Sequence, residues 1–159
     1  MRSHWNLSRK TSGKPLSSTQ IGVQEMIVID THIWVWRANG SPDLTDQHQA
    51  WLEEYEGQGL GVCAISCWEV AKKVEGGKMD LALPIKEWLR QALGLKGVLL
   101  LPLTPEVAAE STLLPGAFHK DPADQIIVAT ARIHGCPLLT ADEKILDYAH
   151  VTCLRGREK

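Results

Sequence analysis

The stretch MIVIDTHIWVW, residues 26–36, contains the first predicted strand of the chain. It opens with a short apolar, β-branched run, which is typical of a buried strand, and the run ends at Asp30. Similar runs follow at residues 60–65, 98–101, 137–139 and 151–154. Helical patterns separate them, at residues 44–55, 67–78, 85–93, 105–113, 122–134 and 142–148. Short apolar strands alternating with helices indicate a parallel sheet covered on both faces, so the sequence predicts an α/β fold.

The composition is typical of one globular domain. The chain has 159 residues, of which 44% are apolar and 23% are charged, and its net charge is −2. No apolar run approaches the roughly 20 residues that span a bilayer. The charge balance excludes a protein held on nucleic acid by overall positive charge. Any nucleic-acid substrate would therefore have to meet a local basic patch or a metal ion.

The first 25 residues differ from the rest of the chain. They are rich in Ser, Thr, Lys and Arg, carry four basic residues against one acidic residue, and show no hydrophobic periodicity. They also lack the apolar region of a signal peptide. We expect residues 1–25 to be a disordered basic extension, or else translation to start at Met26. One domain then covers residues 26–154, and residues 155–159 form a short tail.

The cysteines indicate a reducing compartment. Cys63, Cys67, Cys136 and Cys153 form no C-x-x-C pair, and the sequence shows no secretory signal. A chain of this length does not need disulfides to fold. We therefore expect reduced cysteines in a cytoplasmic protein.

Acidic residues follow the predicted strands. Asp30 comes directly after the first strand, Glu69 shortly after the second, and Asp142 after the fourth. Asp121 and Asp124 open the long helix that precedes the fourth strand. In parallel sheets, ligands bind at the carboxyl ends of the strands, where the strand order reverses. We therefore expect these side chains to converge at one edge of the sheet.

Several of these residues also have a structural interpretation. Ser66 and Glu69 have the spacing of a capping box. Asp121 is placed to cap the long helix, Asp124 lies in its first turn, and Asp142 lies in the first turn of the next helix. Capping and ligand binding do not exclude each other, so both interpretations stay open for each residue.

Taken together, the carboxylates favour a metal site. Carboxylates a few ångströms apart repel one another and raise each other's pKa, so a cluster of them calls for a cation. Oxygen ligands suit Mg²⁺ or Mn²⁺. Such ions activate water and neutralise a phosphate. The sequence therefore predicts hydrolysis of a phosphodiester.

Four segments in order resemble those of PIN-domain ribonucleases, in particular the VapC-type toxins of bacterial toxin–antitoxin pairs. They are MIVIDTHIWVW (26–36), AISCWEVA (64–71), HKDPADQIIVATA (119–131) and PLLTAD (137–142). The resemblance covers residues 26–154 and implies a three-layer α/β/α fold with a parallel sheet of about five strands. It also implies an Mg²⁺-dependent endoribonuclease, with Mn²⁺ as an alternative metal.

The resemblance assigns roles residue by residue. The acidic positions of the family match four carboxylates, which it makes catalytic: Asp30, Glu69, Asp124 and Asp142. Asp30 and Asp124 would be the principal metal ligands, with Glu69 and Asp142 in support. Thr140 is expected to hydrogen-bond a carboxylate or a bound water, and Asp121 to support the ligands from the helix cap.

The resemblance also implies partners. These are an RNA substrate, a VapB-type antitoxin whose C-terminal segment lies over the acidic site, and a second copy of the chain in a homodimer. Lys72, Lys73 and Lys120 are candidates to contact RNA phosphates, although a solvated helix face explains them as well.

Three alternatives remain open. The chain could be a PIN nuclease that processes RNA outside a toxin–antitoxin pair. It could be another metal-dependent phosphohydrolase, although a haloacid-dehalogenase-like enzyme would need an aspartate where this chain has His32. It could also be a binding module whose carboxylates serve only as caps, in which case Asp30→Asn would leave its function intact.

Overall fold

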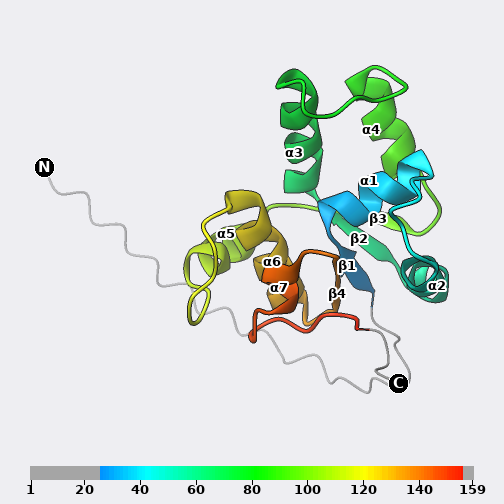
Figure 1. Cartoon of the computed structure of the whole chain (residues 1–159). Coiled ribbons are helices and arrows are strands. Elements are labelled where there is room, and N and C mark those ends of the chain that lie inside the picture. Colours follow the sequence, from blue (N-terminus) through cyan, green and yellow to red (C-terminus); the bar gives the residue numbers. More distant parts are fainter. Residues whose placement is uncertain (1–25, 156–159) are drawn as a thin grey trace, which may run out of the picture.

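A four-stranded parallel sheet forms the middle of the protein (Figure 1). In the computed structural model, which describes residues 26–155, the strands are β1 (Ile27–Ile29), β2 (Leu60–Cys63), β3 (Val98–Leu101) and β4 (Leu138–Leu139). They lie in the order β3-β2-β1-β4, and every pair is parallel. The expectations for residues 1–25 and 156–159 lie outside the described residues.

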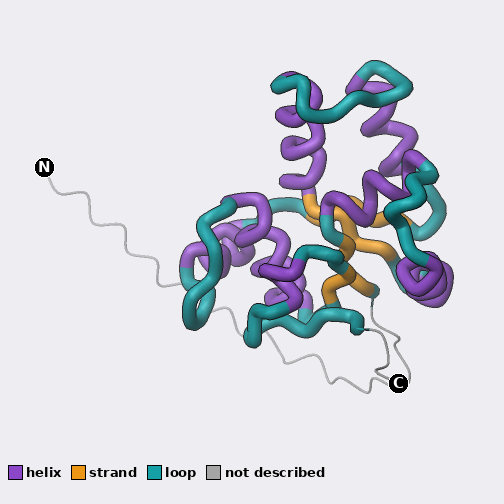
Figure 2. The backbone as a smooth tube through the Cα atoms, viewed as in Figure 1, coloured by secondary structure: helices purple, strands orange, loops and turns teal. Residues whose placement is uncertain are grey.

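Helices cover both faces of this sheet, as Figure 2 shows. Their bounds are α1 (Thr31–Asn39), α2 (Asp46–Tyr55), α3 (Ala64–Glu75), α4 (Ile85–Leu93), α5 (Pro105–Thr112), α6 (Pro122–His134) and α7 (Glu143–Leu146). The predicted three-layer α/β/α fold is therefore confirmed. None of the helices within residues 26–155 is long and apolar enough to cross a membrane.

The side chains of β1 point alternately to the two faces of the sheet, and each face has its own hydrophobic core. Ile27 and Ile29 point to one face of the sheet, where they pack with Trp34 of α1. Val28 points to the other face, where it packs with Ile127 of α6. All of these side chains are fully buried. A strand that is apolar on both faces is typical of a parallel sheet between two helical layers.

A pair of tryptophans anchors the core beneath α1. Trp34 is fully buried, and its ring meets Trp88 of α4 edge-on, with 5.1 Å between the ring centroids. Its Nε1 donates a hydrogen bond to the carbonyl of Ala92 at 3.0 Å. The Nε1 of Trp88 donates to Asn39 Oδ1 at 2.8 Å. Both indole donors are thus satisfied, which removes the cost of burying them.

The structure corrects three expectations. Residues 31–39 form a helix, α1, which the sequence pattern did not predict. The helix predicted to start at residue 67 starts at Ala64, and Cys63 is its N-cap. The predicted fifth strand is reduced to one bridge between Leu138 and Cys153. Because β4 has only two residues, it offers little length for a further strand to pair with.

No disulfide joins the four cysteines, in line with the sequence-based expectation. Cys63 is almost fully buried at the end of β2, and burial raises the pKa of its thiol to about 12. A buried thiol with so high a pKa behaves as a small apolar side chain and is unreactive.

Candidate metal centre

Asp30 lies where β1 ends and α1 begins, and its carboxylate is tied down on both oxygens. It is the N-cap of α1, and Oδ1 accepts a hydrogen bond from the Thr31 amide at 2.7 Å. Oδ2 accepts a hydrogen bond from Thr140 Oγ1, also at 2.7 Å. The residue is only 2% exposed. Its carboxylate therefore has a fixed orientation at the end of the central strand.

Thr140 joins two of the predicted acidic residues. Its hydroxyl donates to Asp30 and accepts a hydrogen bond from the Asp142 amide at 3.0 Å. Thr140 follows β4, which pairs with β1, so this link spans the carboxyl ends of neighbouring strands. The hydroxyl thereby sets the start of α7 relative to the end of β1.

His32 is a third neighbour of the Asp30 carboxylate, after Thr31 and Thr140. Its Nε2 accepts a hydrogen bond from the Ala141 amide at 3.0 Å. In the neutral ring the proton is then on Nδ1, which lies 3.5 Å from Asp30 Oδ2. His32 thus fixes the segment after β4 through its Nε2 and directs the N–H of its Nδ1 toward Asp30.

Asp124 lies in the first turn of α6, opposite Asp30. Its Oδ2 lies 3.1 Å from Nε2 of His119, which precedes the helix. Burial is the main cause that raises the pKa of Asp124 to about 7, and the charges of neighbouring carboxylates raise it further. Those neighbours are Asp30, Asp121, Asp142 and Glu69. The structure therefore brings the predicted carboxylates to one place around Asp124.

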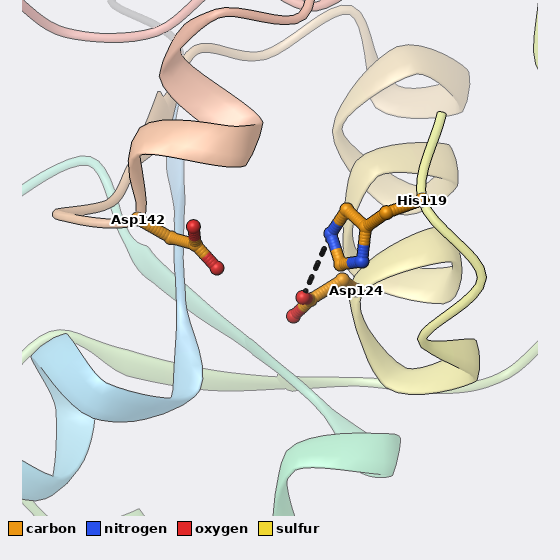
Figure 3. A group of neighbouring side chains, drawn as sticks. All are labelled: His119, Asp124 and Asp142. Atoms are coloured by element: carbon orange, nitrogen blue, oxygen red, sulfur yellow. Dashed lines mark ion pairs between the residues drawn. The ribbon is translucent and has the colours of Figure 1, made fainter. Parts of the chain in front are cut away.

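Two overlapping groups of side chains have the spacing of metal ligands, and both contain Asp124. Glu69, Asp121 and Asp124 offer oxygen ligands that lie within 4.8 Å of one another. His119, Asp124 and Asp142 do the same with one nitrogen and two oxygens (Figure 3). The first donor set suits Mg²⁺ or Mn²⁺, and the second suits Mn²⁺ or a later transition metal. The residues present therefore fit a divalent cation.

The capping interpretation holds for the aspartates but not for Glu69. Asp121 caps α6, where its Oδ1 accepts from the Ala123 amide at 2.9 Å, and Asp142 caps α7 through the Lys144 amide, also at 2.9 Å. Ser66, by contrast, lies inside α3, so the predicted capping box is wrong.

The Ser66 hydroxyl has a different role from the predicted one. Ser66 is fully buried, and its Oγ accepts a hydrogen bond from Thr31 Oγ1 at 2.8 Å. This bond ties the start of α3 to the start of α1. Glu69, one turn further along α3, is thereby left free of a capping role and available to the acidic site.

Comparisons with known proteins agree with this architecture. The model of the PIN domain matches residues 27–151. The chain belongs to the PIN-domain family. A ribonuclease of Mycobacterium tuberculosis, VapC22, is 34% identical over 124 residues, which are 78% of this chain and 92% of that protein.

Solved structures of low sequence identity share the PIN fold. The FitAcB structure from Neisseria gonorrhoeae is 23% identical, with a TM-score of 0.57, over 82% of this chain and 97% of that one. The VapBC2 structure from Rickettsia felis, bound to a DNA fragment from its promoter, is 15% identical. Its TM-score is 0.61, over 81% of this chain and 97% of that one.

The candidate RNA-contact lysines of this PIN domain differ in their surroundings. Lys73 Nζ lies 3.9 Å from Glu69 Oε1, at the rim of the acidic site. Lys72 instead pairs with Glu75 at 2.8 Å, further along α3. Lys120 is exposed beside the cap of α6. Of the three, Lys73 is thus the one with a contact to a carboxylate of the site.

Sequence reasoning missed His119 as a member of the site. It stands in the quoted segment HKDPADQIIVATA, directly before the Lys-Asp-Pro-Ala-Asp turn. Its position depends on packing that the pattern does not carry. Its ring lies 4.5 Å from that of Phe118, and its carbonyl accepts a hydrogen bond from Gln125 Nε2 at 3.1 Å. In the sequence, the one sign that His119 belongs to the site was its position two residues before Asp121, the cap of α6.

Proposed function

We propose that the protein is a metal-dependent endoribonuclease that hydrolyses RNA phosphodiesters as the toxin of a toxin–antitoxin pair. One observation carries the proposal: five carboxylates meet at the carboxyl end of a PIN-domain sheet, where burial and the charges of the other four raise the pKa of Asp124 to about 7. Such a cluster is costly unless a cation or a proton neutralises it. The 34% identity to a ribonuclease supports RNA as the substrate.

The metal we propose is Mg²⁺, with Mn²⁺ as the alternative. Asp124 would be its central ligand, with Glu69 and Asp121 on one side and Asp142 on the other. When bound, the ion supplies an activated water and neutralises the charge of the scissile phosphate. Asp30, fixed by Thr31 and Thr140, would complete the ligands from the end of β1.

The chain's own residues would position the reactants. Asp30 is held so rigidly that its carboxylate needs no reorganisation when the substrate arrives. Asp142 is oriented by the cap of α7, where its Oδ1 accepts a hydrogen bond, and its other oxygen would orient the attacking water. Lys73 would contact a phosphate of the RNA at the rim of the site. We propose that Lys72 and Lys120 contribute less, because neither has a contact to the acidic site among the described residues.

The partner we propose is a small VapB-type antitoxin encoded by a neighbouring gene. Two solved structures with this fold, from Klebsiella pneumoniae and Salmonella typhimurium, are a toxin–antitoxin complex and a DNA-bound VapBC. A cationic side chain of such a partner would neutralise the acidic site in place of metal and block RNA. We further propose a cytoplasmic location and a homodimer, with exposed Leu99 and Leu100 on edge strand β3 as candidate contacts.

The decisive test is cleavage of total RNA by the purified protein without its partner. We expect cleavage in Mg²⁺ or Mn²⁺, none in EDTA, and a loss of at least about 100-fold in Asp30→Asn and Asp124→Asn. Equal cleavage by the wild type and both variants would indicate a contaminating nuclease. No cleavage by any of them, and no metal binding by calorimetry, would leave the aspartates with a structural role at the helix ends only and overturn the proposal.

A further inference from the structure

Two cavities open beside the acidic site, next to α7. The first has a volume of about 430 Å³ and lies between the loop before α6 and the chain from α7 onward. Its walls include Phe118, His119, Lys144, Tyr148 and His150. The second has a volume of about 420 Å³ and lies between α2 and α7. Its walls include His48, Trp51, Thr140, Glu143 and Arg155.

Each cavity is one side chain away from a carboxylate of the site. His119 lines the first cavity, and its Nε2 lies 3.1 Å from Asp124 (Figure 3). Thr140 lines the second cavity, and its hydroxyl donates to Asp30 at 2.7 Å. A phosphodiester placed between Asp30 and Asp124 would therefore have one cavity next to each of its two nucleosides.

A row of aromatic rings leads into each cavity. The first runs from His119 through Phe118 and Tyr148 to His150, with centroid separations of 4.5, 4.7 and 5.5 Å. Tyr148 is locked by a hydrogen bond from its hydroxyl to the carbonyl of Pro115 at 2.5 Å. These rings support one another, so they present a rigid wall to whatever enters the cavity.

The second row starts at the histidine that faces Asp30. It runs from His32 through Trp36 and His48 to Trp51, with centroid separations of 4.9, 6.4 and 6.4 Å. His48 is fixed at its Nδ1, which accepts a hydrogen bond from the Thr45 amide at 3.2 Å. Asp30 and Asp124 thus each have a histidine neighbour that begins a row of rings.

Rings beside a cation suit a nucleotide. Proteins bind single-stranded RNA by stacking unpaired bases on aromatic or histidine rings while lysine and arginine contact phosphates. Lys144 supplies the cation in the first cavity and Arg155 in the second. Each cavity also holds one carboxylate, Asp147 or Glu143, which limits its net positive charge. A peptide helix would instead need one continuous apolar groove.

We propose that the two cavities are nucleobase subsites, one for the base on each side of the scissile phosphate. The proposal rests on the proposed ribonuclease function and adds how the RNA is held. It requires a single-stranded substrate, because both bases must turn out of a helix to enter the cavities. Cleavage preference would then depend on the two nucleotides that flank the cut.

The first test uses the unaltered protein. A short oligoribonucleotide that the protein cuts once is made with a single abasic ribose, placed at each position in turn. We expect kcat/KM to fall roughly 5- to 150-fold when the abasic ribose is directly on either side of the cut. An abasic ribose several nucleotides away serves as the control and should change little. A flat profile across all positions would overturn the proposal.

The second test assigns each cavity to one base. Phe118→Leu and Trp51→Leu remove a ring but keep apolar bulk, and His134→Leu, an exposed ring at the far end of α6, is the matched control. We expect each cavity variant to lose activity on the intact oligonucleotide. On the oligonucleotide that is abasic on its own side of the cut, each variant should equal the wild type. Urea unfolding checks that the variants are folded.

The outcomes separate this proposal from the one it rests on. If the wild type cuts no RNA in Mg²⁺ or Mn²⁺, the proposed function fails. If the wild type cuts RNA, but the loss of activity in each variant is the same on the intact and the abasic oligonucleotides, only the proposal of nucleobase subsites is overturned. If both variants cut normally but lose binding to the antitoxin, the cavities hold protein rather than RNA, and the proposal is again wrong.

Discussion

Two regions of the molecule are held in different ways. One is the apolar core around Trp34 and Trp88, and the other is the group of carboxylates around Asp124. The tryptophans are buried with every indole donor bonded, so their region stabilises the fold by itself. The carboxylates are brought together by the ends of β1 and β4, by α3 and by the start of α6, and they repel one another. The apolar region thus contributes the free energy of folding that offsets the repulsion between the carboxylates, as is common for functional sites.

Removing the centre of the apolar region should have the largest effect on stability. We expect Trp34→Ala to lower the free energy of unfolding by about 3–5 kcal/mol, because it leaves a cavity and breaks the bond to Ala92. Trp34→Phe keeps most of the volume and should cost less. Urea denaturation measures both. A loss below that of Trp34→Phe would show that this region is not the main support of the fold.

A variant that lacks the Thr140 hydroxyl tests whether the hydrogen bonds of the acidic site also contribute to stability. Thr140→Val removes the donor to Asp30 and the acceptor for the Asp142 amide while keeping the shape. We expect it to cost about 1–3 kcal/mol, because buried polar groups lose their partners. Cleavage activity should fall as well. Thr140→Ser should restore both, and unaltered stability in the valine variant would contradict the role given to the hydroxyl.

The carboxylates should make the metal-free protein sensitive to pH. The pKa of Asp124 is about 7 in the folded protein against an ordinary value of 3.8, so the folded state holds the extra proton between these values. Stability should therefore fall as pH rises from about 4 to about 7. Relative to Asp124→Asn, we expect the wild type to lose about 1–2 kcal/mol from pH 4.5 to pH 7.5, because partial exposure weakens the effect.

Thermal unfolding in EDTA at both pH values measures this difference. Adding Mg²⁺ at pH 7.5 should return most of the lost stability to the wild type and little to Asp124→Asn. A wild type and a variant with parallel pH profiles would show that Asp124 ionises normally in the folded protein.

The smallest effect expected is at the rim of the acidic site. We expect Lys73→Ala to lower kcat/KM for RNA by about two- to fivefold, because an exposed charge contributes little. Lys72→Ala is the matched control on the next position of α3, where the lysine pairs with Glu75 instead. Equal losses in the two variants would point to a general effect of charge on RNA binding rather than to Lys73.

The sequence predicted the meeting of the carboxylates because parallel strands end at one edge of a sheet. It failed on α1, whose residues include Thr31, Ile33, Trp34 and Val35, because β-branched and aromatic residues favour strands over helices. Burial of Trp34 and the Asp30 cap outweigh that preference. The predicted capping box was wrong for a similar reason. The spacing between Ser66 and Glu69 fits such a box, but the hydrogen-bond partner of the Ser66 hydroxyl is Thr31, 35 residues away. Contacts between distant segments decide both cases.

The hydrogen bond between Thr140 and Asp30 joins residues that are 110 positions apart. A ribosome adds about 5–20 residues per second, so roughly 5–20 s separate the synthesis of the two residues. For most of that time the growing chain holds Asp30 without Asp124, and for all of it without Thr140 and Asp142. The acidic site can therefore be assembled only after Asp142 has been synthesised, and until then the growing chain has no complete centre with which to cut the messenger RNA that encodes it.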